Sequence, residues 1–281
     1  MAIQFSKATK AKSKLRLAID GPAGAGKTYT SLQIAQLLGG KTALIDSEHG
    51  SASLYSDRFD FDTVSLESHS LMVYLETIQA AAAAGYENLI VDSLSHAWSG
   101  KGGALEQVDK MGGSKFSNGW KTVSPLLARV IDALLSYPGN VICTMRTKTA
   151  YEVVNENGRA VPKKVGLAPV MRDGVEYEFS LVVDLTHEGT LTVSKSRCAP
   201  LSGGVFMRED IPRMVKTLTE WLGSGSVLSP REALAEKIRF ASSQAALDAL
   251  VPELKALPAE DLAAIKPAYV AKKQELAVSD E

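Results

Sequence analysis

Hydrophobic residues gather in short runs, and segments with helical spacing separate them. The apolar runs predict buried strands over residues 14–20, 41–46, 89–92 and 140–145. The segments between them predict helices over residues 27–38, 71–84 and 122–135. Strands that alternate with helices indicate an α/β fold with a mainly parallel sheet covered on both faces. Such sheets carry ligands at the carboxyl ends of their strands.

The pattern changes beyond Lys148. A pair of β-strands is expected over 178–185 and 189–194, followed by a helix over 211–222. Gly-Ser-Gly-Ser at 223–226 is typical of a linker, and prolines divide residues 229–278 into what we expect to be three short helices. The predicted organisation is a flexible basic tail (1–13), an α/β core (14–222), a linker (223–228) and a small C-terminal α-helical domain (229–281).

The turn between the first strand and the first helix has the sequence Gly-Pro-Ala-Gly-Ala-Gly-Lys-Thr. It matches the phosphate-binding pattern G-x-x-x-x-G-K-[ST] in its expected strand–loop–helix context. Glycines let backbone N–H groups converge on phosphate oxygens, a lysine adds a cation, and a threonine hydroxyl suits Mg²⁺. The alternative is an ordinary glycine-rich turn. The predicted nucleotide-binding residues are Gly21, Pro22, Ala23, Gly24, Ala25, Gly26, Lys27, Thr28 and Tyr29.

Composition narrows the class of protein. The 281 residues, 45% of them hydrophobic, can bury a sizeable core. No apolar stretch has the length of a membrane span, and the polar, lysine-bearing N-terminus does not resemble a secretory leader. The two cysteines argue against a disulfide framework and a zinc site. We therefore expect a soluble protein of a reducing cytoplasm.

Two acids follow predicted strands. Asp92 ends an apolar run, where a carboxylate would hold Mg²⁺; the alternative is a turn acid or the cap of a helix. Glu48 follows the second strand and could orient or deprotonate a water that attacks a γ-phosphate. Taken alone, it would be read as a solvated loop acid.

Together these segments resemble the RecA-type recombinase family. Ile-Asp-Ser-Glu-His at 45–49 is similar to that family's Ile-Asp-Ala-Glu-His element, and Leu-Ile-Val-Asp-Ser at 89–93 to its Val-Val-Asp-Ser segment. The resemblance covers roughly residues 14–205. It implies a RecA-like P-loop NTPase core, with Glu48 as the catalytic glutamate and Asp92 on the metal.

Further positions carry over with departures from the family. Arg146 or Thr144 stands where the family usually has a glutamine that senses the γ-phosphate. Lys195 and Arg197 follow a strand much as the family's lysine pair does, which reaches across a subunit interface. The alternative for this pair is an exposed edge strand protected by charge. Arg146, Lys195 and Arg197 are therefore predicted catalytic residues beside Lys27 and Glu48.

Basic residues cluster in two segments that we expect to be loops, 99–121 and 147–172. Cations on a flexible backbone with a few aromatic residues suit single-stranded DNA. The alternative is a lid over the nucleotide or a solvated loop. The predicted DNA-binding residues are Lys101, Lys115, Lys148, Arg159, Lys163 and Lys164.

The chain is similar to the short RecA-like single-strand annealing ATPases of bacteriophages. This resemblance implies an ATP- and Mg²⁺-dependent DNA recombination protein in the cytoplasm of a bacterial host. The expected partners are single-stranded DNA, further copies of the chain in a filament or ring with ATP between subunits, and a single-strand binding protein contacted by the C-terminal region. Two alternatives remain open: a motor or adaptor for phage replication or packaging, and a P-loop kinase of a small molecule.

Overall fold

The computed structural model describes residues 13–112, 118–156, 159–225, 229–241 and 244–278. Contacts divide the chain into two compact units. The larger unit comprises residues 14–221, and the smaller contains residues 222–281. The expected tail lies almost wholly outside the described residues, as does the second half of the expected linker.

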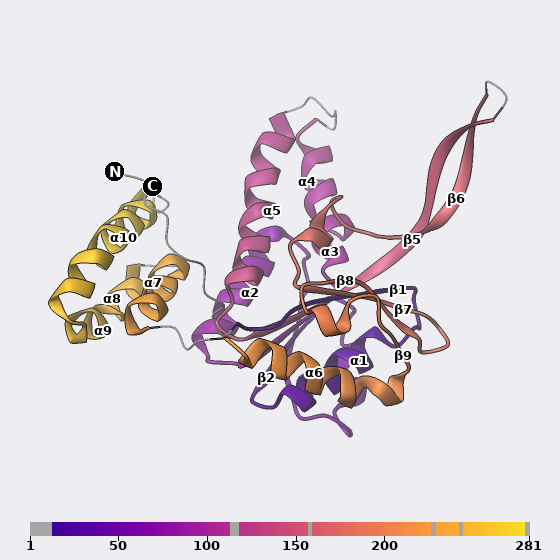
Figure 1. The fold of residues 1–281 in the computed structure, drawn as a ribbon. Coiled ribbons are helices and arrows are strands. Elements are labelled where there is room, and N and C mark those ends of the chain that lie inside the picture. The colour runs from indigo at the N-terminus through magenta and orange to yellow at the C-terminus, as the bar shows by residue number, and fades with distance from the viewer. Residues whose placement is uncertain (1–12, 113–117, 157–158, 226–228, 242–243, 279–281) are drawn as a thin grey trace. The chain divides into compact units, whose positions relative to one another are not determined.

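A sheet of nine strands organises the described part of the larger unit (Figure 1). Its strands are β1 (Arg16–Gly21), β2 (Thr42–Asp46), β3 (Asp62–Ser65), β4 (Asn88–Asp92), β5 (Asn140–Glu156), β6 (Arg159–Pro169), β7 (Leu181–Leu185), β8 (Leu191–Ser196) and β9 (Val205–Phe206). The order is β3-β2-β4-β5-β1-β7-β8-β9, with β6 paired to β5. The first six strands in this order are parallel to one another. β8 is antiparallel to β7, and β9 is antiparallel to β8.

Helices cover both faces of the sheet. They are α1 (Lys27–Leu38), α2 (Leu71–Ala83), α3 (Ser95–Ser99), α4 (Ala104–Lys110), α5 (Asn118–Ser136) and α6 (Ile211–Gly223). In Figure 1, α1 and α6 lie on one face and α2, α3 and α5 on the other. Burial from both sides explains why the central strands are continuous apolar runs: every residue of β4 is buried. The predicted α/β class with a mainly parallel sheet is confirmed.

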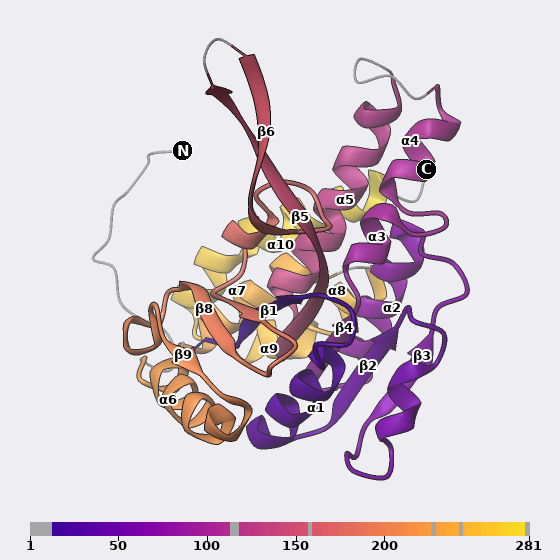
Figure 2. The ribbon, with the colours of Figure 1, turned by 90° about the vertical axis from the view of Figure 1, so that its right-hand side faces the viewer.

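The expected loop over 147–172 is wrong. β5 continues beyond Met145 to Glu156 and pairs antiparallel with β6, in register from Thr147 opposite Pro169 to Glu156 opposite Arg159. The two strands form a ribbon that projects from the sheet (Figure 2). The sequence between them contains Asn-Gly at 157–158, a dipeptide that favours two-residue hairpin turns. This dipeptide indicates the hairpin, whereas the basic residues around it do not distinguish a loop from a strand.

Other boundaries also differ. The expected loop over 99–121 contains α4 and the first turn of α5, while residues 113–117, Lys115 among them, lie outside the described residues. The two shortest strands of the sheet proper, β3 and β9, were not predicted. Arg197 lies one residue beyond the end of β8, so it does not share that strand with Lys195.

The smaller unit has a core of its own. Its helices in the described residues are α7 (Pro230–Phe240), α8 (Gln244–Asp248), α9 (Val251–Ala256) and α10 (Ala259–Val278). The buried side chains between them are Leu234, Ile238, Ala241, Leu247, Leu254, Ile265 and Leu276. Three short helices were expected, but α10 continues through Pro267. No helix among the described residues is long and apolar enough to span a membrane.

Candidate functional site

The turn between β1 and α1 has the backbone shape of a phosphate-binding loop. Gly24 and Gly26 have positive φ angles of 79° and 88°, which favour glycine. Gly21 lies so close to β7 that an added Cβ would be 2.6 Å from the carbonyl oxygen of Leu185. Gly26 also directly precedes α1, so the loop leads into a helix N-terminus, where unpaired N–H groups favour an anion.

Lys27 is buried against this loop, with 9% of its surface exposed. Its Nζ donates to the carbonyl oxygens of Gly21 at 2.8 Å and Pro22 at 2.9 Å. Burial lowers the pKa of the ammonium group, and the carboxylates of Asp92 and Glu48 partly offset that effect. The loop therefore holds a cation close enough to interact with Asp92, the predicted metal ligand, and Glu48, the predicted catalytic acid.

Asp92 connects the loop to the middle of the sheet. It ends β4, is 2% exposed, and accepts a hydrogen bond at 2.5 Å from the hydroxyl of Thr28 and another at 2.5 Å from that of Thr144. Burial raises the pKa of this carboxyl, and the two hydroxyl groups act in the opposite direction. A carboxylate beside a hydroxyl supplies the hard oxygen ligands that Mg²⁺ prefers, so these residues fit the predicted metal.

Asp46 shapes the turn that carries Glu48. It is 1% exposed, and its two carboxylate oxygens accept hydrogen bonds from the backbone N–H groups of Glu48 at 2.6 Å and Ala52 at 3.0 Å. His49 has a positive φ of 57° within this turn. The sequence motif included Asp46 but gave no reason for its presence; the structure shows that it fixes the backbone around Glu48.

Arg146 and Thr144 make different contacts, although either could occupy the sensor position predicted from the sequence. Arg146 donates from Nε at 3.1 Å and Nη2 at 2.8 Å to one oxygen of Glu48. Thr144 is fully buried and bonds to Asp92. Two residues of β5, two positions apart, thus bind the predicted metal ligand Asp92 and the predicted catalytic acid Glu48.

The strand order brings these side chains to one edge of the sheet. β2, β4, β5 and β1 are consecutive neighbours. Asp46 is opposite Asp92 in the register, and Gly21 is opposite Arg146. Because the four strands are parallel, the phosphate loop and the acids that follow β2 and β4 meet at their carboxyl ends.

A comparison with known protein families agrees with this geometry. A family model described as an AAA domain matches residues 13–219. The chain belongs to the AAA domain family. Membership confirms the prediction of a P-loop ATPase in this general sense. No curated protein matches the sequence.

Asp20 is a buried acid of the AAA domain that no motif singled out. It precedes the phosphate loop on β1, is 4% exposed, and its Oδ1 has no hydrogen-bond partner within the described part of the chain. Burial raises the pKa of its carboxyl to about 7, the charges of Asp184 and Glu176 add to this effect, and Lys27 opposes it. A pKa this far from the ordinary value occurs often at functional sites.

A polar network lies behind the acids of the AAA domain. The hydroxyl of Ser47 donates to the carbonyl of Asp92 at 3.1 Å and lies 2.8 Å from Nδ1 of His96. His69 stacks on His96 with ring centroids 4.7 Å apart, and its Nε2 lies 3.2 Å from the carbonyl of Ser47. Burial lowers the pKa of both histidines. The backbone N–H of His69 donates to the carbonyl of Lys101 at 3.0 Å, so the network reaches the start of the basic segment.

The remaining predicted nucleotide and catalytic residues lie near the phosphate loop, on β8 or directly after it. The ring of Tyr29 makes edge contacts with Tyr55 at 5.9 Å and Phe59 at 5.2 Å between centroids. The Nζ of Lys195 donates to backbone carbonyls of its own chain, including those of residues 176 and 179. Arg197 is exposed.

The predicted DNA-binding residues occupy two elements. Lys101 is exposed between α3 and α4, and Lys148 is exposed near the base of the ribbon. Arg159, Lys163 and Lys164 belong to β6, opposite Glu156, Glu152 and Tyr151 of β5.

Arg208 contacts the phosphate loop of the AAA domain, although it belongs to no motif. It begins a short 3₁₀ turn, η4 (Arg208–Asp210), directly before α6. Its Nη2 donates to the carbonyl of Ala25 at 2.5 Å. The contact crosses 183 positions of the chain, so spacing in the sequence could not have indicated it.

Proposed function

We propose that this AAA domain hydrolyses ATP with Mg²⁺, and that its nucleotide state controls the binding of single-stranded DNA in recombination or annealing. One observation carries the proposal. β5 binds the predicted metal ligand Asp92 through Thr144 and the predicted catalytic acid Glu48 through Arg146, and the same strand continues without a break into the basic ribbon. A displacement of β5 on nucleotide binding would therefore also displace the ribbon.

The phosphate loop would supply most of the nucleotide affinity. Its N–H groups and the Lys27 ammonium provide positive charge for the phosphates. Thr28 and Asp92 would hold Mg²⁺, which neutralises phosphate charge when it is bound. ATP is favoured over GTP because the sequence contains no Asn-Lys-x-Asp motif that would recognise guanine.

Glu48 would orient and deprotonate the attacking water. Its carboxylate is 29% exposed and the Arg146 side chain 47% exposed, so their ion pair contributes about 0–1 kcal/mol to stability. A pair this weak can rearrange when nucleotide enters. Before nucleotide binds, Arg146 holds the Glu48 carboxylate at the carboxyl ends of the parallel strands, beside the phosphate loop.

Neighbouring subunits would complete the site. Lys195 would have to leave three carbonyl groups of its own chain to reach a neighbour's phosphates. Arg197 is exposed, so within the predicted pair it is the better candidate to reach a neighbouring subunit.

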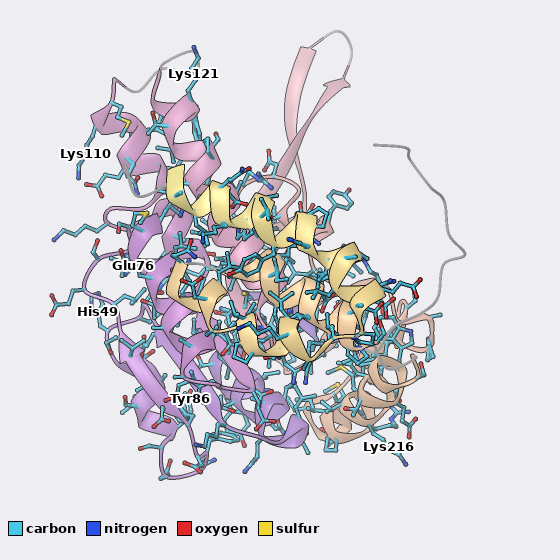
Figure 3. All side chains as sticks on the ribbon, turned by 90° about the vertical axis from the view of Figure 1, so that its left-hand side faces the viewer. His49, Glu76, Tyr86, Lys110, Lys121 and Lys216 are labelled. Atoms are coloured by element: carbon cyan, nitrogen blue, oxygen red, sulfur yellow. The ribbon has the colours of Figure 1, made fainter. Side chains whose placement is uncertain are left out.

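The free edge of the sheet supports assembly with further copies of the chain. All four residues of β3 are exposed at that edge. A groove of about 470 Å³ lies beside the strand, lined mainly by apolar surface and by Glu76 and Tyr86, which Figure 3 labels. An open strand edge beside an apolar groove is normally covered. A second copy of the chain would cover it in a filament or ring.

The β5–β6 ribbon supports contact with a nucleic acid. Its sequence over 147–169 carries four basic residues, Lys148, Arg159, Lys163 and Lys164, against two acidic residues. Phosphate neutralisation by such cations gives affinity that depends little on base sequence and falls steeply with salt. Lys101 lies in a second segment, and it is tied to Asp92 through His69 and Ser47. Lys110, which pairs with Glu106 at 2.7 Å, and Lys121 belong to the same segment, at the end of α4 and in the first turn of α5 (Figure 3).

The resemblance to short bacteriophage RecA-like annealing ATPases supports a phage-encoded protein that works in the cytoplasm of a bacterial host. The smaller unit would then contact a single-strand binding protein. Its separate hydrophobic core favours an independently folded module for such a role.

ATP hydrolysis with and without single-stranded DNA tests the enzymatic part of the proposal. We expect DNA to accelerate phosphate release, and Lys27→Ala and Glu48→Gln to abolish it. Lys41→Ala is the matched control, because Lys41 is exposed beyond the end of α1. Normal hydrolysis by Glu48→Gln would show that Glu48 is not the catalytic base.

A further inference from the structure

The guanidinium of Arg208 lies against the phosphate loop on the side away from Glu48 and Asp92. β1 has two neighbours, β5 and β7. Thr144 and Arg146, which bind the acids, come from the β5 side. Arg208 follows β9, which lies on the β7 side of β1, beyond β7 and β8 in the sheet. Its Nη2 donates to Ala25, and an added Cβ on Gly26 would be 2.5 Å from the same atom.

One donor of this guanidinium has no acceptor in the part of the chain that the structure describes. Nε of Arg208 is a buried polar atom without a hydrogen-bond partner among the described residues. Gly189, in the turn between β7 and β8, leaves room for it, since an added Cβ there would lie 3.1 Å from Nε. A buried N–H of a charged group is costly to leave without a partner. Because this N–H has almost no surface open to solvent, the side chain would have to turn to present it to an acceptor of a ligand, and that bond would remove the cost.

The loop beside Arg208 has the shape of a phosphate-binding loop, so the oxygen of a bound phosphate group is the natural acceptor for this donor. An arginine offers several N–H donors in one plane, which match the oxygens of a phosphate group. His187 lies on the same side, since an added Cβ on Gly24 would be 3.9 Å from its ring. The γ-phosphate would face Glu48, across β5. The phosphates nearest to Arg208 are accordingly those that ATP and ADP share.

We propose that Arg208 is a nucleotide-contacting residue that donates to a phosphate oxygen common to ATP and ADP. The inference rests on the proposed nucleotide binding and adds to it a residue from the far end of the domain. Because the contact does not involve the γ-phosphate, Arg208 would retain the product as strongly as the substrate. It would thereby slow the release of ADP, whereas Glu48 would act on hydrolysis.

Titration of the purified full-length chain with fluorescent ATP and ADP analogues tests this role. We expect Arg208→Met to weaken both nucleotides by the same factor of about ten, as expected for one charge-assisted hydrogen bond. Arg208→Lys keeps the charge but not the planar donors, and should weaken both at least threefold. Arg213→Met is the matched control: Arg213 lies on α6 and pairs with Asp210 at 3.1 Å in solvent. It should leave both affinities unchanged.

Other results would overturn the inference. The first is an unchanged affinity for ADP in Arg208→Met and Arg208→Lys, and the second is a loss of affinity for ATP alone. The third is a lower melting temperature of the nucleotide-free protein with no change in either affinity. Lys27→Ala separates these failures from failure of the proposed function. If Lys27→Ala loses nucleotide while the Arg208 variants keep it, only the role of Arg208 is wrong. If Lys27→Ala also binds normally, the proposed nucleotide site itself is wrong.

Discussion

Replacing Asp20 with asparagine should stabilise the protein, and more so as the pH rises. Asp20 is 4% exposed, and burial, with Asp184 and Glu176, raises the pKa of its carboxyl from 3.8 to about 7, against the attraction of Lys27. The folded protein therefore holds a proton between these pH values that the unfolded chain releases. The stability that this proton contributes is complete below about pH 3.8 and is lost as the pH rises to about 7.

The magnitude follows from the size of the shift. The pKa rises by about three units, and each unit corresponds to about 1.4 kcal/mol, so ionised Asp20 costs the folded state up to about 4 kcal/mol above neutral pH. At pH 5 most of that cost is still absent, because the folded protein keeps the carboxyl neutral. Asparagine never ionises. The advantage of Asp20→Asn over the wild type should grow by about 2–3 kcal/mol between pH 5 and pH 8.5.

Urea unfolding of the nucleotide-free protein across this pH range measures the effect. Asp57→Asn is the control, because its side chain is 71% exposed; its difference from the wild type should stay within about 0.5 kcal/mol at each pH. A constant difference between Asp20→Asn and the wild type from pH 5 to pH 8.5 would refute the reasoning. So would a wild type that is the more stable protein at pH 8.5.

Two further substitutions test the packing around the site. Thr144→Val removes the hydroxyl that donates to Asp92, and urea unfolding should show that the free energy of unfolding falls by about 1–3 kcal/mol. Thr144→Ser should retain most of this stability, and equal losses in both variants would contradict the role of the bond. Gly21→Ala places a methyl group 2.6 Å from the carbonyl of Leu185, and a loss of about 1–3 kcal/mol is expected in the same assay. Gly223→Ala serves as its control, because an added Cβ there would meet no atom of the described residues within 4 Å outside its own helix and chain neighbours. Similar losses in both variants would show that the close approach to β7 is unimportant.

The sequence predicted those parts of the fold whose causes are local. The apolar run before Gly21 and the helical pattern after Lys27 gave β1 and α1, and the acids that follow β2 and β4 indicated the edge where the site lies. These features depend on burial and on strand direction, which a single segment reveals. The ribbon differs from the predicted loop because its strands pair with each other around an Asn-Gly dipeptide, and basic side chains are compatible with either structure.

Contacts between distant segments could not be predicted. Arg146 and Glu48 are 98 positions apart, and Arg208 and Ala25 are 183 apart. Neither pair forms a spacing pattern, because the sheet order and the connections between strands decide which side chains meet. The pKa of Asp20 likewise depends on burial by several elements. From the sequence it is only one acid before a glycine.

The affinity for single-stranded DNA in different nucleotide states tests the central claim most directly. Fluorescence anisotropy of a labelled oligothymidylate would be followed with no nucleotide, with ADP and with a slowly hydrolysed ATP analogue. The account predicts that the ATP analogue tightens binding at least tenfold, that this response is absent in Lys27→Ala, and that Glu48→Gln binds tightly in ATP itself. It also predicts that affinity falls steeply with salt. Equal affinity in all nucleotide states of the wild type would contradict the coupling of the phosphate loop to DNA.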